Sequence, residues 1–303
     1  MAECLLVTGA SGYLGSCLIR QAAARWRVIA ATHTRGVAVE GVDEVRLDIR
    51  EGDAVRDLVR ATRPRAIIHT AMDTTSPESM QAVIVEGTRN VALASADVGA
   101  YFIHMSTDMV FDGEHAPYVP EDMPKPVTPY GQAKARAEEI VAALLPTAAI
   151  VRTSLIYGFS PPDPRTLWVL DSVRGRHPIT LFTDEVRCPV WVEQLAAALL
   201  ELTRREMPGT WHLAGPQAID RYSFGVRLAR AFGLDPAEIK PGLSRESGLV
   251  RPRDLTLYVE PGAARLSAPL WGVDSVLSRL GKVREASRSP RRFAKVGQAP
   301  LKE

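Results

Sequence analysis

The sequence predicts an α/β fold, a doubly wound parallel sheet with a smaller C-terminal lobe. Short apolar, β-branched segments alternate with amphipathic stretches of helix length through the first half of the chain. Connections of that length join parallel strands by right-handed crossovers and cover both faces of the sheet. The stretch TGASGYLG, directly after the first apolar segment, supports the same fold, because it is typical of a strand that turns sharply into a helix.

The expected strands are, in chain order, CLLVTGA, RVIAAT, DEVRLDI, RAIIHTA, YFIHMST and AAIVRTSLIYG. Helices are clearest at SCLIRQAAARW and EGDAVRDLVRATR. After Gly158 the segment FSPPDPR is dense in proline, and strands and helices alternate less regularly. We therefore expect a sheet domain at residues 1–157, to which residues 186–214 return with VEQLAAALLEL and TWHLAG. Residues 158–185 and 215–281 form the expected second lobe.

Composition and charge exclude several classes of protein. Of the 303 residues, 46% are hydrophobic and 24% are charged, as in ordinary globular proteins. The apolar runs are shorter than the roughly 18 residues that span a bilayer, and the N-terminus does not resemble a signal peptide. We expect a cytoplasmic protein that does not contact membranes.

The net charge of +2 arises at the C-terminus. Residues 282–303 contain seven Lys or Arg and two Glu, a local charge of +5 that leaves about −3 for the rest. This segment is also rich in Ser and Pro, so we expect a flexible tail. A solvated tail is preferred over a nucleic-acid contact, because no basic groove interleaved with aromatic residues occurs elsewhere.

The cysteines and histidines do not suggest a metal site. Cys4, Cys17 and Cys188 are odd in number and far apart, which fits reduced thiols. The six histidines form no H-x-x-x-H or H-E-x-x-H pattern, so no metal is predicted.

The glycine turn predicts a dinucleotide site. Gly9, Gly12 and Gly15 let the backbone approach a pyrophosphate closely, and the free N–H groups of the following helix attract the anion. The spacing is G-x-x-G-x-x-G instead of G-x-G-x-x-G, so only the physical logic of the Rossmann-like fingerprint matches. We interpret residues 1–157 as a dinucleotide-binding domain rather than a purely structural turn. The expected contacts from this turn are Gly9, Ser11, Gly12, Tyr13, Leu14 and Gly15.

The end of the second strand favours NADP(H), with NAD(H) as the alternative. An NAD site usually has an acid about 20 residues beyond the last glycine, but no Asp or Glu occurs from Ser16 to Val39. Arg35 stands there with Thr34, and a guanidinium suits a 2′-phosphate, although a solvated arginine is the alternative. Asp48 and Ile49 are expected at the adenine, and Thr70 and Ala71 at the nicotinamide ribose.

Three residues predict hydride chemistry. Tyr130 and Lys134 stand four apart at a helix start marked by Pro129, so both side chains can point into one cleft. Thr107 ends the fifth strand, where ligands bind in open α/β sheets. Tyr–Lys pairs four residues apart also occur on surface helices without any catalytic role, which is the alternative. With the glycine turn beside them, we expect Tyr130 to exchange a proton with a carbonyl oxygen, Thr107 to orient that oxygen and Lys134 to hold the cofactor's ribose.

The proposed proton transfer requires that the pKa of Tyr130 be shifted from its usual value. A phenol with a pKa near 10 is a poor acid or base at neutral pH. An ammonium at about 4 Å and an effective dielectric near 20 is worth at most roughly 4 kcal/mol. We therefore expect Lys134, together with the positive charge of an oxidised nicotinamide, to lower the pKa of Tyr130.

At these residues the chain resembles the extended short-chain dehydrogenase/reductase superfamily. STDMVFDGEHAPYVPEDMPKPVTPYGQAKARAE is similar to the corresponding segment of the dTDP-4-dehydrorhamnose reductase family, as are VRTSLIYG and, more loosely, WHLAG and RPRDLTL. The resemblance implies NADPH-dependent reduction of the 4-keto group of a nucleotide-linked deoxysugar. It also implies Thr107, Tyr130 and Lys134 as the catalytic set.

The chain departs from the family pattern where substrate should bind. Cys188-Pro189-Val190 replaces a small residue, Pro and Thr, while Asp254 and Tyr258 replace Asn and Asp. The expected substrate contacts are Thr107, Asp108, Arg187 and Arg251, and Arg152 is a further candidate for the diphosphate. Salt-bridged structural arginines are the alternative. Trp168, Trp191 and Trp211 are interpreted as core residues rather than stacking partners.

Two other functions stay open. One is a cofactor-binding regulatory subunit like the β subunit of methionine adenosyltransferase, which resembles the same family. The other is a nucleotide-sugar epimerase or dehydratase, which would recycle its cofactor. A homodimer is also open.

Overall fold

A seven-stranded parallel sheet forms the centre of the protein, and its order is β11-β6-β5-β4-β1-β2-β3. The computed structural model describes residues 2–288. The doubly wound fold is therefore confirmed, and the chain reverses direction across the sheet at β1 and β4. The strands are β1 (Cys4–Thr8), β2 (Arg27–Thr32), β3 (Val42–Arg46), β4 (Ala66–His69), β5 (Tyr101–Thr107), β6 (Ala149–Thr153) and β11 (Gly209–His212).

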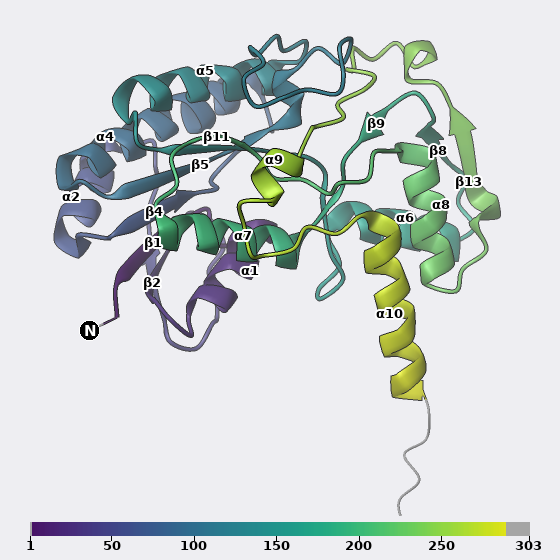
Figure 1. The fold of residues 1–303 in the computed structure, drawn as a ribbon, viewed down its shortest axis with the longest axis horizontal. Helices are drawn as coiled ribbons and strands as arrows, with labels where there is room; N and C mark the ends of the chain where they lie inside the picture. Colours follow the sequence, from purple (N-terminus) through teal and green to yellow (C-terminus); the bar gives the residue numbers. More distant parts are fainter. Residues whose placement is uncertain (1, 289–303) are drawn as a thin grey trace, which may run out of the picture.

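Helices cover both faces of this sheet (Figure 1). Side chains of a strand alternate between the faces, so Leu5 and Val7 pack on one side and Leu6 on the other. The first face is covered by α1 (Tyr13–Ala22) and α7 (Val192–Arg205). The second is covered by α2 (Gly52–Thr62), α4 (Thr88–Val98) and α5 (Pro129–Leu144).

Helix α5 begins where the sequence predicted. Pro129 occupies the first turn, and the Thr128 hydroxyl accepts a hydrogen bond from Gly131 N at 3.1 Å. Ala133, Ala137 and Ile140 pack against Ile84 and Val85. Those two residues belong to a π-helical segment, η1 (Met80–Gly87), between α3 (Pro77–Ser79) and α4. The sequence did not reveal this π-helix, which presses against the helix that carries Tyr130.

Three two-stranded sheets lie beyond the carboxyl edge of the main sheet, on the right of Figure 1. They pair β7 (Ile156–Tyr157) with β10 (Val190–Trp191), β9 (Val186–Arg187) with β12 (Ile219–Asp220), and β8 (Ile179–Phe182) with β13 (Ile239–Gly242). Helices α6 (Pro164–Arg174) and α8 (Arg221–Ala231) pack beside them. Short helices complete the chain: η2 (Asp108–Val110), η3 (Pro236–Glu238), η4 (Ser244–Glu246) and α9 (Glu260–Ala263).

The last helix, α10 (Val273–Arg288), includes the first residues of the predicted basic tail. The rest of that tail lies outside the described residues. Within residues 2–288, no helix is long and apolar enough to cross a membrane.

Three histidines are buried in the neutral form. Burial lowers the pKa of His69 to about 3 and that of His212 to about 4, and it lowers the pKa of His104 well below its usual value. Lys134 adds to the effect at His69 and His104. Neither ring nitrogen of His104 has a hydrogen-bond partner among the described residues.

We predict that the free energy of unfolding falls as the pH falls from about 6.5 to 4, because the unfolded chain then binds protons that the folded protein excludes. Each histidine contributes a slope of at most about 1.4 kcal/mol per pH unit. Urea denaturation at several pH values measures it. His104→Leu should flatten the slope relative to the wild type, while His177→Gln, at an exposed site, should leave it unchanged. Equal slopes for His104→Leu and the wild type would contradict the assignment.

Candidate active site

A cavity of about 520 Å³ opens at the carboxyl edge of the main sheet. It brings together residues that lie more than 200 positions apart in the chain. Among the residues predicted for the site, those that line it are Gly12, Tyr13, Leu14, Gly15, Thr70, Thr107, Tyr130, Lys134, Arg187 and Arg251. The other predicted residues, Gly9, Ser11, Thr34, Arg35, Asp48, Ile49, Ala71 and Asp108, are not in its lining.

Two glycines make the first turn possible. Gly9 has a φ of +69°, and a Cβ atom there would lie 2.6 Å from Ala71 N. At Gly15 a Cβ atom would lie 2.3 Å from Gly9 O. No other residue type fits either position, because both contacts are with backbone. Gly9 and Ala71 therefore shape the turn from behind the cavity wall.

The turn presents the start of α1 to the cavity. The first hydrogen bond of the helix runs from Ser16 N to Gly12 O, so the amides of Tyr13, Leu14 and Gly15 precede it. No acidic residue occupies the first turn. The Tyr13 hydroxyl donates to Pro161 O at 2.9 Å and thereby ties this turn to the proline-dense segment. The local backbone suits an anionic group such as a pyrophosphate.

The predicted adenosine-binding residues follow β2 and β3. Thr34 and Arg35 are exposed just beyond β2, and Ile49 is buried. Asp48 accepts hydrogen bonds from Arg50 Nε at 2.9 Å and from Arg50 Nη2 at 2.5 Å, and His33 Nε2 lies 3.4 Å from Oδ2, the oxygen that accepts from Nη2. These hydrogen bonds from Arg50 lower the pKa of Asp48 to about 2. Asp48 is thus held as a carboxylate.

A carboxylate outside the segment from Ser16 to Val39 lies beside the same loop. Glu44 Oε1 accepts a hydrogen bond from the Thr32 hydroxyl at 2.8 Å, and Glu44 Oε2 accepts one from Val37 N at 3.3 Å. Glu44 belongs to β3, and the pairing of β2 with β3 brings it next to the end of β2. Glu44 lies further along the chain than the position about 20 residues after the last glycine, where the acid of an NAD site is expected. The loop therefore combines an acid with the exposed Arg35.

Thr107, Tyr130 and Lys134 meet in the cavity, as predicted. Thr107 ends β5 and accepts a hydrogen bond from Met109 N at 3.2 Å. Tyr130 and Lys134 stand one turn apart on α5. Lys134 is 3% exposed, and its Nζ donates to Met105 O at 2.9 Å. The lysine is thereby anchored to the strand that carries Thr107.

Burial raises the pKa of Tyr130 to about 12. A hydrogen bond with Thr107 and the charges of Arg187 and Arg165 oppose the rise, and Asp108 adds to it. The expectation that Lys134 lowers the pKa of Tyr130 is therefore wrong for the protein alone, because loss of solvation outweighs the nearby cations. Tyr130 is protonated at neutral pH, the state in which it can donate a proton.

The same loss of solvation acts on the lysine. Burial lowers the pKa of Lys134 to about 8, and Glu138, one turn further along α5, opposes this shift. Lys134 still carries a proton for most of the time at pH 7.

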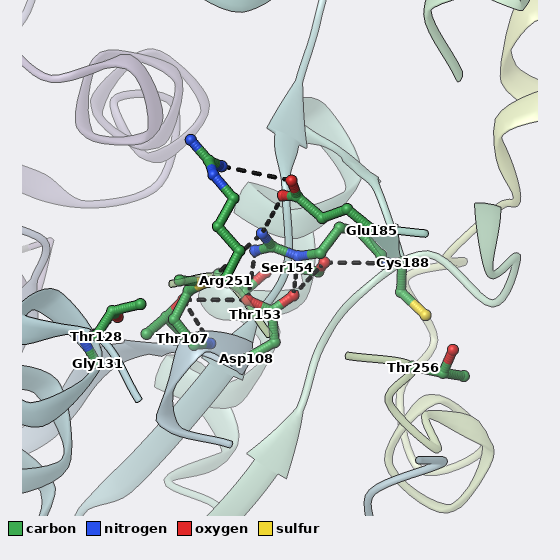
Figure 2. A network of polar contacts seen from close by, with 12 residues as sticks. Thr107, Asp108, Thr128, Gly131, Thr153, Ser154, Glu185, Cys188, Arg251 and Thr256 are labelled. Carbon is green, nitrogen blue, oxygen red and sulfur yellow. Dashed lines mark hydrogen bonds and ion pairs between the residues drawn. The ribbon is translucent and has the colours of Figure 1, made fainter. Parts of the chain in front are cut away.

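Behind the cavity wall, Asp108 and Arg187 form a buried ion pair. Arg187 Nε lies 2.7 Å from Asp108 Oδ2, and Arg187 Nη2 lies 2.5 Å from Oδ1. Asp108 also accepts hydrogen bonds from Ser154 Oγ at 2.5 Å and from Thr107 Oγ1 at 3.2 Å. Figure 2 shows this network, in which Ser154 also accepts a hydrogen bond from Cys188 N at 3.1 Å. Asp108 was predicted to contact substrate, but both of its oxygens are committed to these partners.

A second acid meets the arginines at the far side of the cavity. Glu185 is 5% exposed, and its carboxylate lies 3.4 Å from Arg251 Nη1 and 3.8 Å from Arg187 Nη1 (Figure 2). Arg165, at the start of α6, and Arg221, at the start of α8, line the same cavity. Glu185, Arg165 and Arg221 could not be predicted from the sequence, because their segments carry no motif and only folding brings them together.

Arg152 is structural and does not line the cavity. Its guanidinium lies 2.9 Å from Glu138 Oε2, donates to Pro120 O and Asp122 O at 3.1 Å each, and stacks over Phe111. Glu138 also accepts a hydrogen bond from Ser106. The diphosphate contact considered for Arg152 is replaced by this buried pair.

The three tryptophans considered for stacking are likewise absent from the cavity lining. Trp211 is buried under Arg265, and Trp191 stacks on Trp271, as expected for core positions. Trp168 differs, since 47% of it is exposed.

Known proteins are similar to this chain in sequence and in fold. A chain from Mycobacterium tuberculosis described as "dTDP-4-dehydrorhamnose reductase" is 32% identical over 83% of this chain and 83% of its own length. "Methionine adenosyltransferase 2 subunit beta" of Xenopus tropicalis is 27% identical over 78% of this chain and 74% of its own. The crystal structure of a dTDP-4-dehydrorhamnose reductase from Bacillus anthracis, in complex with NADP, is 25% identical and covers 92% of this chain and 99% of its own, with a TM-score of 0.79.

The match to a family model extends over both parts of the structure. The model described as "RmlD substrate binding domain" covers residues 3–266, from β1 through α9. That range contains the glycine turn, the three residues on β5 and α5, and the arginines around Glu185. The chain belongs to the RmlD substrate-binding domain family.

Proposed function

We propose that this protein is an NADPH-dependent reductase of the 4-keto group of a nucleotide-linked deoxysugar. One observation carries the proposal: Thr107, Tyr130 and Lys134 line the same cavity as the glycine turn at the start of α1. The family relationship and the reductases among the relatives support it.

The residues of the first turn fit a dinucleotide. A Cβ atom at Gly9 or Gly15 would fill the space in which the backbone closes, and the amides at the start of α1 face the cavity. Arg35 is exposed just beyond β2, where its guanidinium can bind a 2′-phosphate. Glu44 stands where a ribose hydroxyl of NAD(H) would be accepted, so NAD(H) is the second candidate cofactor.

NADPH, when bound, supplies the hydride. Tyr130 is the proton donor to the carbonyl oxygen, since burial keeps its hydroxyl protonated at neutral pH. Thr107 hydrogen-bonds the same oxygen and fixes its position. Lys134, anchored at Met105 O, holds the ribose hydroxyls.

Positively charged side chains support a nucleotide-sugar as the substrate. Arg165, Arg187, Arg221 and Arg251 line the part of the cavity next to α6 and α8, as an anionic nucleotide requires. In the proposed division of labour, the sheet domain binds the cofactor and residues 158–185 and 215–281 bind the nucleotide-sugar. A cytoplasmic location and a homodimer remain predictions.

We predict that Tyr130→Phe lowers kcat for reduction of a dTDP-4-keto-6-deoxysugar by about 100-fold or more, because general acid catalysis contributes roughly 10²–10⁴-fold. Oxidation of NADPH, followed by its absorbance, measures the rate. Tyr258→Phe is the matched control, since Tyr258 is exposed and lies outside the cavity lining.

The same assay separates the alternatives. Tight NADPH binding without turnover of any keto-sugar would favour a regulatory subunit like the methionine adenosyltransferase relatives. Epimerisation without net NADPH consumption would favour an epimerase. An unchanged rate in Tyr130→Phe would overturn the role of Tyr130.

We predict that Arg35→Ala weakens NADPH binding by about 10- to 100-fold and leaves NADH binding nearly unchanged, because one charge-assisted contact is worth roughly 1.5–3 kcal/mol. Titration of cofactor fluorescence gives both dissociation constants. Arg25→Ala is the control, since Arg25 is also exposed but lies between α1 and the amino end of β2. Equal losses for the two cofactors would contradict recognition of a 2′-phosphate by Arg35.

A further inference from the structure

Four arginines from four different segments surround one acid on the substrate side of the cavity. Arg165, Arg187, Arg221 and Arg251 all line it, and so does Glu185. If a nucleotide-sugar binds here, as the proposed function requires, only some of the four guanidinium groups are available to contact it. The ion pairs that already exist within the protein separate the four arginines into two kinds.

Two of the arginines are already committed. Both Nε and Nη2 of Arg187 are used by Asp108, which is fully buried. Arg251 is paired with Glu185 at 3.4 Å. These are the two arginines that the sequence nominated for the substrate. An arriving anion would have to compete with an acid for either of them.

The other two arginines are uncommitted. No side chain among the described residues lies within hydrogen-bond or ion-pair distance of the guanidinium of Arg165 or Arg221. They are neighbours, since both also line a small pocket between α6 and α8. Burial lowers the pKa of Arg221 to about 10; Glu185 opposes the shift, and Arg187, Arg165 and Arg251 add to it. A bound anion would relieve this crowding of positive charge.

Each of the two helices that carry these arginines is capped by an aspartate, Asp163 at α6 and Asp220 at α8. Arg165 and Arg221 stand in the first turns of α6 and α8, each of 11 residues. Asp163 also lines the cavity, but its carboxylate is occupied by Arg165 N at 3.0 Å and Thr166 N at 3.1 Å. Asp163 is held by backbone amides, and within residues 2–288 no acid forms a direct ion pair with the guanidinium of Arg165 or Arg221.

Glu185 limits how much negative charge the site accepts. It is buried between Arg187 and Arg251, and its backbone oxygen accepts a hydrogen bond from Arg221 N at 3.1 Å. A sugar ester of a nucleoside diphosphate carries two negative charges. A free nucleoside diphosphate carries about three, because a terminal phosphate has a second pKa near 6. The third charge would be repelled by Glu185 at short range.

We propose that Arg165 and Arg221 clamp the diphosphate of a nucleotide-sugar, and that Glu185 makes the site prefer this diester over the free nucleoside diphosphate. The inference rests on the proposed function for the class of ligand. It goes further in assigning recognition to two arginines that no motif marks, and in giving an acid a role in discrimination.

Equilibrium binding tests the clamp without any turnover. The probes are dTDP-glucose, a diester without a ketone, and dTDP, each titrated by calorimetry at pH 8 into the full chain. We expect the wild type to bind dTDP-glucose more tightly than dTDP. Arg165→Ala and Arg221→Ala should each weaken dTDP-glucose binding by about 10- to 100-fold, the range for a charge-assisted contact. Arg174→Ala, an exposed residue at the other end of α6 that pairs with Asp171, should change it less than twofold.

Glu185→Gln tests the discrimination, because it removes the charge and keeps the shape. We expect the ratio of the dTDP dissociation constant to the dTDP-glucose dissociation constant to fall by about five- to tenfold, an estimate from one screened charge interaction. Far-UV circular dichroism and NADPH binding check that each variant is folded. Glu185→Asp, which restores the charge, should recover part of the ratio.

The outcomes distinguish this inference from the proposed function. Unchanged dTDP-glucose binding in both Arg165→Ala and Arg221→Ala would overturn the clamp, even if the enzyme reduces keto-sugars. An unchanged ratio in folded Glu185→Gln would overturn the discrimination. Conversely, weaker dTDP-glucose binding in both arginine variants, in a protein that reduces no keto-sugar, would uphold the clamp while the reductase proposal fails.

Discussion

The buried pair of Asp108 and Arg187 joins the two parts of the site. Asp108 follows β5 directly, and Arg187 lies on β9 beyond the main sheet, so the pair fixes β5 against the segment that carries Glu185. Removing one partner of such a pair usually costs about 3–5 kcal/mol, because the other is left charged and buried. Ser154 and Thr107 complete the hydrogen bonds of Asp108 and tie β5 and the residue after β6 into the same unit. The relative position of Tyr130 and the arginines depends on this unit.

Loss of solvation sets the chemistry on the other side of the cavity. Tyr130 stays protonated because its ring is packed against η1 and loses solvation, and the same loss makes Lys134 easier to deprotonate. Arg187 and Arg165 partly offset the shift at Tyr130, so charges beyond the sheet reach the proposed proton donor. In the proposed site, Arg165 therefore takes part both in diphosphate binding and in setting the pKa of Tyr130.

Pairing within the protein decides what each arginine can do. Three arginines form ion pairs with acids: Arg152 with Glu138, Arg187 with Asp108, and Arg251 with Glu185. Arg165 and Arg221 line the cavity and form no ion pair within residues 2–288. All five carry the same charge and differ only in their neighbours. The departure from the family pattern at Cys188-Pro189-Val190 directly follows Arg187, which lines the substrate side of the cavity.

The sequence alone determined the order of strands and helices, the glycine turn and the set of Thr107, Tyr130 and Lys134, because each depends on local patterns: alternation of apolar residues, a backbone conformation open only to glycine, and positions one helical turn apart. Tertiary structure alone decided the rest. Strand pairing brought Glu44 to the loop after β2, and folding turned Asp108 and Arg152 from expected ligand contacts into buried partners. It also raised the pKa of Tyr130, since burial and the distances between charges are properties of packed neighbours that a linear sequence does not contain.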